Sequence, residues 1–110
     1  MKLTEKKCLP CEGGVQPMNQ EQTEALLPSI PSWSASQKYD KISREFTFNN
    51  FIETMAFVNT VAEIAEREQH HPDIECGYNY CRVHFSTHAI GGLSENDFIC
   101  AAHINEVANR

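Results

Sequence analysis

Histidine is concentrated in one short stretch of the sequence. Of the five histidines, four fall between residues 70 and 88: His70, His71, His84 and His88. With an unperturbed pKa of about 6.5, an imidazole can both donate and accept a proton near neutral pH. These residue types indicate general acid–base chemistry, and the chain positions of His70, His71 and His88 make them the candidates.

The three candidate histidines lie where structural elements are expected to end. His70 and His71 directly precede Pro72, at the end of a predicted helix, where the macrodipole favours an imidazolium. His88 follows a predicted strand and precedes Gly91-Gly92, a pair that lets backbone approach a ligand closely. Ends of elements and loops are where a rigid scaffold displays reactive groups.

Each candidate also has a purely structural interpretation. His70 and His71 could interact with the last carbonyls of the helix, and His88 alone could be a loop histidine bonded to backbone. Asp97 stands three residues after Ser94, the spacing of a helix capping box, so one carboxylate oxygen could cap while the other faces a cleft. His84 is assigned no role, and neither is His103.

Three helices are predicted to carry these residues. The first is capped by Asn19 with Gln22 and runs to about Leu27, because Pro28 and Pro31 prevent its continuation. The second, roughly 51–70, opens with Asn50 and Glu53 in capping-box spacing. The last is capped by Ser94, with one apolar side: Phe98, Ala101, Ala102 and Ala108. The predicted core face of the second helix is Phe51, Met55, Val58, Ala62 and Ala65.

Four short strands complete the predicted fold. A strand over 33–39 is hairpinned near Asp40 to one in which Ile42, Phe46 and Phe48 alternate with polar residues. Strands over about 73–78 and 81–87 are joined at Asn79-Tyr80. The order helix-strand-strand-helix-strand-strand-helix demands no parallel pairing, so we predict an α+β fold: a two-layer, four-stranded antiparallel sheet with three helices on one face.

Length and composition limit the classes of function. The 110 residues predict a single domain over 1–110, with 1–18 an irregular lead-in. Nine Lys plus Arg against fifteen Asp plus Glu give a net charge of −6, which argues against binding to nucleic-acid phosphates. The sequence has no apolar run long enough to predict a membrane-spanning helix.

The cysteines predict a reduced protein without a metal. Five cysteines are an odd set for a disulfide framework, and without a secretory signal we expect thiols in the cytoplasm. Cys8 and Cys11 have the CxxC spacing of a redox or zinc site, but Gly13-Gly14 follows at once and no strand precedes. Cys76 and Cys81 do not supply a regular second ligand pair.

Several of these features together resemble one enzyme family. The segments that carry the resemblance are EREQHHPD at 66–73, YN at 78–79, STH at 86–88 and GGLSENDF at 91–98, together with Phe46-x-Phe48-x-x-Phe51 and the opening KKCLPCEGG. In order and spacing they resemble the pterin-4a-carbinolamine dehydratases, in particular bacterial members, and the similarity covers nearly the whole chain.

The resemblance implies a reaction and a site. The reaction is the dehydration of 4a-hydroxytetrahydropterin to quinonoid dihydropterin and water without a cofactor, which recycles the pterin for an aromatic amino acid hydroxylase. His70 and His88 take the acid and base roles, and His71 binds or orients the pterin. The other implied substrate-site residues are Glu66, Asp73, Thr87 and Asp97, of which Asp97 supports the histidines.

The resemblance has one departure and leaves two other hypotheses. After His-His-Pro-Asp many relatives have an aromatic residue, whereas this chain has Ile74, so a stacking contact with the pterin is lost.

Animal relatives also bind a transcription factor, which suggests a protein-interaction module as the alternative function. A zinc module built from the Cys and His residues is the third hypothesis. The family forms dimers and tetramers, and an exposed sheet edge favours pairing, so we expect a homo-oligomer.

Overall fold

The structure, a computed structural model, describes residues 2–9 and 16–109. Its elements in chain order are η1 (Leu3–Glu5), α1 (Gln20–Leu26), η2 (Leu27–Ser29), β1 (Ser34–Ala35), β2 (Ile42–Thr47), α2 (Phe51–Glu68), β3 (Asp73–Cys76), β4 (Tyr80–Phe85), η3 (His88–Ile90) and α3 (Glu95–Ala108). The predicted order of helices and strands is confirmed, and η1, a single 3₁₀ turn, is an addition within the predicted lead-in.

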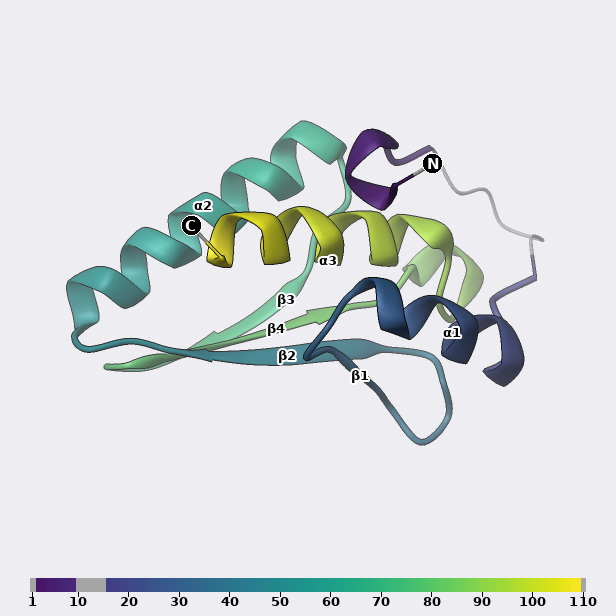
Figure 1. Cartoon of the computed structure of the whole chain (residues 1–110), viewed down its shortest axis with the longest axis horizontal. Helices are drawn as coiled ribbons and strands as arrows, with labels where there is room; N and C mark the ends of the chain where they lie inside the picture. The colour runs from purple at the N-terminus through teal and green to yellow at the C-terminus, as the bar shows by residue number, and fades with distance from the viewer. Residues whose placement is uncertain (1, 10–15, 110) are drawn as a thin grey trace.

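The four strands form one antiparallel sheet in the order β1-β2-β4-β3. The long central pair sets Ile42 opposite Phe85 and Phe46 opposite Cys81, so that these core side chains lie on the same face. Figure 1 shows α1, α2 and α3 on one side of this sheet. The predicted two-layer α+β fold with helices on one face is therefore confirmed.

The strand boundaries differ from the prediction, most clearly in two places. The first strand is limited to Ser34–Ala35, because Tyr39 N–H donates to the Ser36 carbonyl and the following residues turn back toward β2. In the second hairpin, Tyr80 belongs to β4 and pairs with Thr47, so the turn lies before it rather than at Asn79-Tyr80. Both differences are shifts of a turn within a correctly predicted hairpin.

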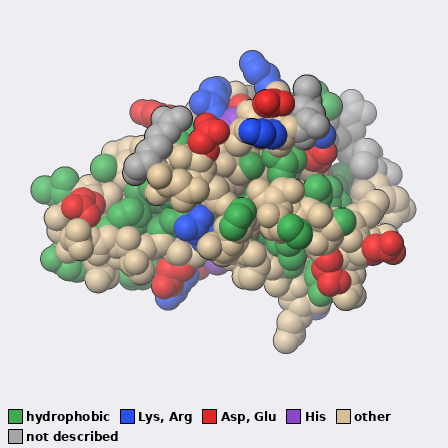
Figure 2. Space-filling view, in the orientation of Figure 1, with side chains coloured by type: hydrophobic (Ala, Val, Ile, Leu, Met, Phe, Trp, Pro, Cys, Tyr) green, Lys and Arg blue, Asp and Glu red, His purple; other side chains and the backbone are tan. Residues whose placement is uncertain are grey.

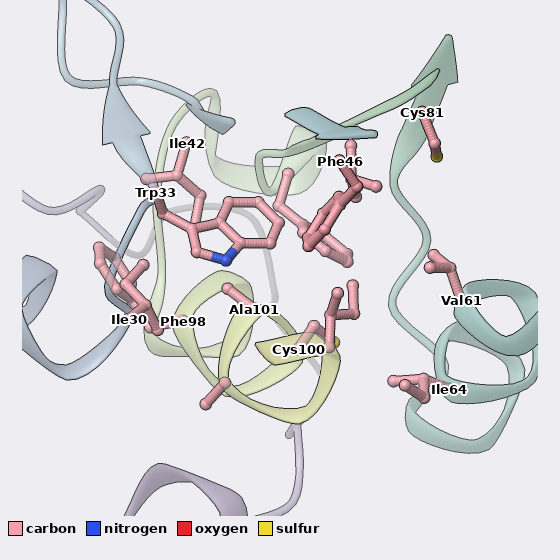
Figure 3. Packing of buried hydrophobic residues seen from close by; sticks show 14 of the residues in the cluster. Ile30, Trp33, Ile42, Phe46, Val61, Ile64, Cys81, Phe98, Cys100 and Ala101 are labelled. Carbon is pink, nitrogen blue, oxygen red and sulfur yellow. The ribbon is translucent and has the colours of Figure 1, made fainter. Parts of the chain in front are cut away.

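Side chains from the sheet and from the helices on its covered face build one core. Figure 3 shows Trp33, Ile42 and Phe46 from the sheet side facing Phe98, Ala101 and Cys100 of α3, with Val61 and Ile64 of α2 beside them. The Trp33 indole N–H donates to Asn105 Oδ1 at 2.7 Å, so an acceptor on α3 satisfies this buried donor. The core thus lies between the sheet and the two longer helices, α2 and α3.

The predicted core face of α2 was wrong for Phe51 and Ala62, whereas Val58 is partly buried against the core as predicted. The buried residues are Thr54, Phe57, Val61, Ile64, Ala65 and Glu68. Only Ala65 belongs to both sets; Ala62 is exposed and Phe51 is half exposed. Both stripes follow three- and four-residue spacing, and packing against the sheet and α3 selects the one that contains Phe57, Val61 and Ile64.

Two surface properties complete the description. Figure 2 shows acidic and basic side chains interspersed on the visible face of the molecule. No helix within residues 2–9 and 16–109 is both long enough and apolar enough to cross a bilayer.

Candidate active site

A cleft of about 570 Å³ lies where the end of α2, the end of β4, the start of α3 and the N-terminal segment meet. This volume falls in the range of small-molecule sites. Its lining residues come from four separate stretches of chain: Cys8 and Leu9; Arg67, Glu68, Gln69, His70 and His71; Ser86, Thr87, His88 and Ala89; and Asn96. The three histidines predicted from the sequence therefore line one cleft.

The end of α2 aims His70 into this cleft. Gln69 adopts a left-handed conformation (φ 54°), and its N–H donates to the carbonyls of Ala65 and Glu66, which ends the helix one turn before Pro72. The His70 N–H donates to the Ala65 carbonyl at 3.1 Å. The imidazole then stacks on Phe85 of β4 with 5.8 Å between ring centroids and 8° between planes. His70 is thus held by both its backbone and its ring.

A buried carboxylate backs the His70 ring. Asp97 is fully buried, and its Oδ1 lies 2.6 Å from His70 Nε2. Its Oδ2 accepts from the Thr87 hydroxyl at 2.8 Å and from the Ser94 N–H at 3.0 Å. An ionised carboxylate only accepts, so neutral His70 carries its proton on Nε2 and leaves Nδ1 as the proton acceptor. Asp97 therefore caps α3 with one oxygen and orients His70 with the other.

His71 and His88 occupy more open positions. His71 Nε2 forms a hydrogen bond with the carboxylate of Glu66, and both side chains are exposed. His88 begins η3 and is exposed at the cleft. Gly91 ends η3 with φ 67°, a conformation that suits glycine, and a Cβ on Gly92 would come within 2.7 Å of Pro17. Gly91 thus permits the turn that ends η3, and Gly92 leaves room for Pro17.

Some predicted residues lie outside the cleft lining. Asp73 is exposed on β3, opposite His84 of β4. His84 lies against Ser43 and Glu75, at 2.6 Å from each, through its two ring nitrogens. Glu66 reaches the cleft only through His71, whereas Thr87 both lines the cleft and bonds Asp97.

Two polar residues of the cleft, Glu68 and Asn96, were missed by sequence reasoning. Burial acts to raise the pKa of Glu68, but the Cys8 N–H, the Arg67 guanidinium and His103 together hold it below its ordinary value. Glu68 follows Val61 and Ile64 on the buried face of α2, so the correct helical stripe would have indicated it. Asn96, on the first turn of α3, had no comparable signal.

Two of the cysteines, Cys8 and Cys100, lie next to each other. Cys8 Sγ is 3.6 Å from Cys100 Sγ, and the hydrogen bond between them and burial raise the pKa of the Cys100 thiol. Cys11, the second cysteine of the CxxC pattern, lies outside the described residues. Among residues 2–9 and 16–109 no three His, Cys, Asp or Glu side chains converge as metal ligands.

Comparison with known proteins places this geometry in a family. The family model described as pterin 4 alpha carbinolamine dehydratase matches residues 16–107. A protein of Nitrosomonas europaea named "Putative pterin-4-alpha-carbinolamine dehydratase" is 55% identical over 104 residues, 94% of this chain and 90% of that protein. A protein of the same name from Halorhodospira halophila is 51% identical over 105 residues, 96% of each chain.

Solved structures share the fold. A transcriptional coactivator/pterin dehydratase from Brucella melitensis superposes with a TM-score of 0.79 and 27% identity, over 84% of this chain and 99% of that one. A pterin dehydratase-like protein described as a RuBisCO assembly factor in the alpha-carboxysome has a TM-score of 0.61 and 26% identity, over 70% of this chain and 89% of that one.

Proposed function

This chain belongs to the pterin-4-alpha-carbinolamine dehydratase family and is a dehydratase of that kind, and from this premise we propose how it works. It dehydrates 4a-hydroxytetrahydropterin to quinonoid dihydropterin and water by histidine acid–base catalysis without a cofactor. His70 and His88 exchange the two protons of the reaction. The product returns to the tetrahydropterin pool that an aromatic amino acid hydroxylase uses.

The chemistry requires two proton transfers and no electron transfer. The bond between C4a and its hydroxyl oxygen breaks as that oxygen gains a proton, and water leaves. The N5–H proton passes to a base while the N5 electron pair forms the C4a–N5 double bond. Two imidazoles that change charge near neutral pH suit these steps, each worth a factor of about 10²–10⁴.

The observation that carries the proposal is the arrangement around His70. Its ring lies on the cleft, stacked on Phe85 and 2.6 Å from the buried Asp97 carboxylate. Such a carboxylate stabilises the imidazolium that forms when His70 accepts a proton. His88 lines the same cleft from the β4–α3 connection, so the two imidazoles can serve one substrate.

The remaining predicted residues take supporting parts in the proposal. His71, paired with Glu66, binds and orients the pterin at the cleft mouth. Thr87 and Asp97 support binding through His70. Asp73 is proposed as a binding residue from the family resemblance, and its exposed position outside the cleft lining makes it the member with least geometric support.

The test is the dehydration rate of His70→Ala and His88→Ala, each measured with the carbinolamine. We expect kcat to fall by about 10²–10⁴-fold in each, because one proton transfer loses its positioned group. His84→Ala is the matched control, since His84 lies against Ser43 and Glu75 away from the cleft. Wild-type rates in both cleft variants would refute the assignment.

We further propose a single functional domain that acts as a homodimer or homotetramer in the cytoplasm. In the part of the chain that the structure describes, β3 is an edge strand, which supports self-association because an unpaired strand edge favours pairing. The net charge of −6 argues against a nucleic-acid partner.

A further inference from the structure

The N-terminal segment is held against α2 and α3 at several points. Lys6 Nζ lies 2.9 Å from Glu95 Oε2, and Leu3 and Cys8 are partly buried against the core. η1 packs on α3, and Figure 1 shows this turn beside the end of α2. These contacts therefore fix the position of the N-terminal segment where it reaches the cleft.

Asn96 binds the backbone of Leu9 through both ends of its side-chain amide. The Leu9 N–H donates to Asn96 Oδ1 at 3.0 Å, and Asn96 Nδ2 donates to the Leu9 carbonyl at 2.6 Å. Asn96 is 7% exposed. The Asn96 amide uses a donor and an acceptor on the backbone of Leu9. Moving that backbone away would leave these buried polar atoms without their hydrogen bonds, so the pair fixes the position of Leu9.

Glu68 supplies a second attachment on the adjacent residue. The Cys8 N–H donates to Glu68 Oε1 at 3.0 Å. The Glu68 side chain is 5% exposed and lies 3.3 Å from the Arg67 guanidinium. This bond lowers the pKa of Glu68 against the effect of burial, so the attachment persists at neutral pH.

These attachments leave the Leu9 side chain at the cleft. Leu9 lines the cleft and is 73% exposed. Nearly all other lining side chains are polar or charged, among them Arg67, Gln69, His71 and Ser86. A flat heterocycle binds best where an apolar side chain covers one of its faces or edges.

We propose that Leu9 is a substrate-contacting residue and that Asn96 is its positioning residue. The inference rests on the proposed function, since the ligand is the pterin. Leu9 supplies the apolar wall of the cleft, and Asn96 holds that wall in place through the Leu9 backbone. The segment thus belongs to the binding site although it lies more than fifty residues from the histidines in sequence.

The test separates binding from turnover in Leu9→Ala and Asn96→Ala. We measure KM and kcat with the carbinolamine, and the Kd of 7,8-dihydrobiopterin, which has no 4a-hydroxyl to lose, by calorimetry. We expect KM and Kd to rise about three- to ten-fold in both variants, with kcat within about two-fold of wild type. Ile52→Ala, which truncates an 82% exposed side chain at the start of α2, is the control.

Three outcomes would overturn the inference. The first is an active Leu9→Ala variant with wild-type KM and Kd. The second is an Asn96→Ala variant that loses thermal stability while both values stay unchanged, which would make Asn96 purely structural. The third is a loss of kcat without a change in binding. If wild type binds dihydrobiopterin but does not dehydrate the carbinolamine, the proposed function fails. The Kd of dihydrobiopterin for Leu9→Ala still tests whether the Leu9 side chain contacts the bound pterin.

Discussion

At the scale of single residues, Asp97 connects the fold to the proposed chemistry. The same carboxylate accepts the Ser94 N–H at the start of α3 and lies against His70 at the cleft. A buried carboxylate in this position is stabilised only while each oxygen has its donor. The site is therefore built from groups that the start of the helix also needs.

Replacing Asp97 by asparagine tests this double role. Asp97→Asn keeps the size of the side chain but removes the charge, and its amide can donate to His70 and change which ring nitrogen carries the proton. We expect kcat to fall by about 10²-fold or more and the melting temperature to drop, measured by dehydration kinetics and thermal denaturation. Asp40→Asn, which alters a contact in the β1–β2 turn, is the control.

A full dehydration rate in the folded Asp97→Asn protein would mean that the carboxylate contributes only to stability. The melting curve identifies the folded fraction, so loss of activity by unfolding is distinguished from loss of the catalytic arrangement.

The buried thiols should resist alkylation. Burial and the neighbouring Cys76 raise the pKa of Cys81 to about 11. Because the thiolate is the reactive form, Cys81 stays protonated and unreactive at pH 8, and its thiolate fraction increases only as the pH approaches 11. With iodoacetamide at pH 8 we expect peptide mass spectrometry to find Cys76, which is exposed, labelled and Cys81 unlabelled.

Unfolding in denaturant provides the control, because both cysteines should then react. Equal labelling of Cys81 and Cys76 in the native protein would contradict the burial of Cys81.

At the scale of elements, α2 determines where His70 and His71 lie, because they directly follow its end. It begins at the Asn50 cap, whose Oδ1 accepts the Glu53 N–H at 2.9 Å, and it ends at the left-handed Gln69. The Gln69 end adjoins His70, so a change there would alter how His70 meets Phe85 and Asp97. The C-terminal end of α2 therefore contributes to the site together with the helix face, which carries Glu68.

Removing the cap should weaken the fold by a measurable amount. Asn50→Ala deletes the acceptor for a backbone N–H, and we expect a loss of about 1 kcal/mol in the free energy of unfolding. Urea denaturation measures it. Asn49→Ala is the matched control, because only the Asn49 backbone N–H, and not its side chain, bonds Glu53. Equal stability of the two variants would show that the cap contributes nothing.

At the scale of the whole molecule, helices cover one face of the sheet and β3 lies at one of its edges. Among residues 2–9 and 16–109, β3 pairs with β4 alone, whereas β1 at the opposite edge is two residues long. An unpaired edge strand is a site where a second chain can add. Self-association would also place more of the chain's exposed apolar side chains out of water.

Sedimentation equilibrium tests the proposed homo-oligomer. We expect a mass of two or four times the 12.5 kDa of the chain, maintained on dilution through the micromolar range. A mass of 12.5 kDa at every concentration would refute self-association, while leaving the dehydration chemistry untouched.

Much of the fold was determined by local sequence. The capping residues Asn19, Asn50 and Ser94 each begin the helix that was predicted, and the alternation from Ile42 to Phe46 correctly indicated a strand. These signals depend on interactions within a few residues, so the sequence alone contains them. The spacing of the histidine segments likewise carried the family resemblance.

Only the tertiary structure decided which surfaces meet. It selected the stripe of α2 that contains Phe57 over the one that contains Phe51, and it brought Asn96 to the backbone of Leu9. It also placed the two oxygens of Asp97 between His70 and the start of α3. The hydrophobic effect is non-directional, and it sums over segments that are distant in sequence. A local sequence pattern therefore does not determine which apolar face of a helix is buried, or which polar side chains are buried with it.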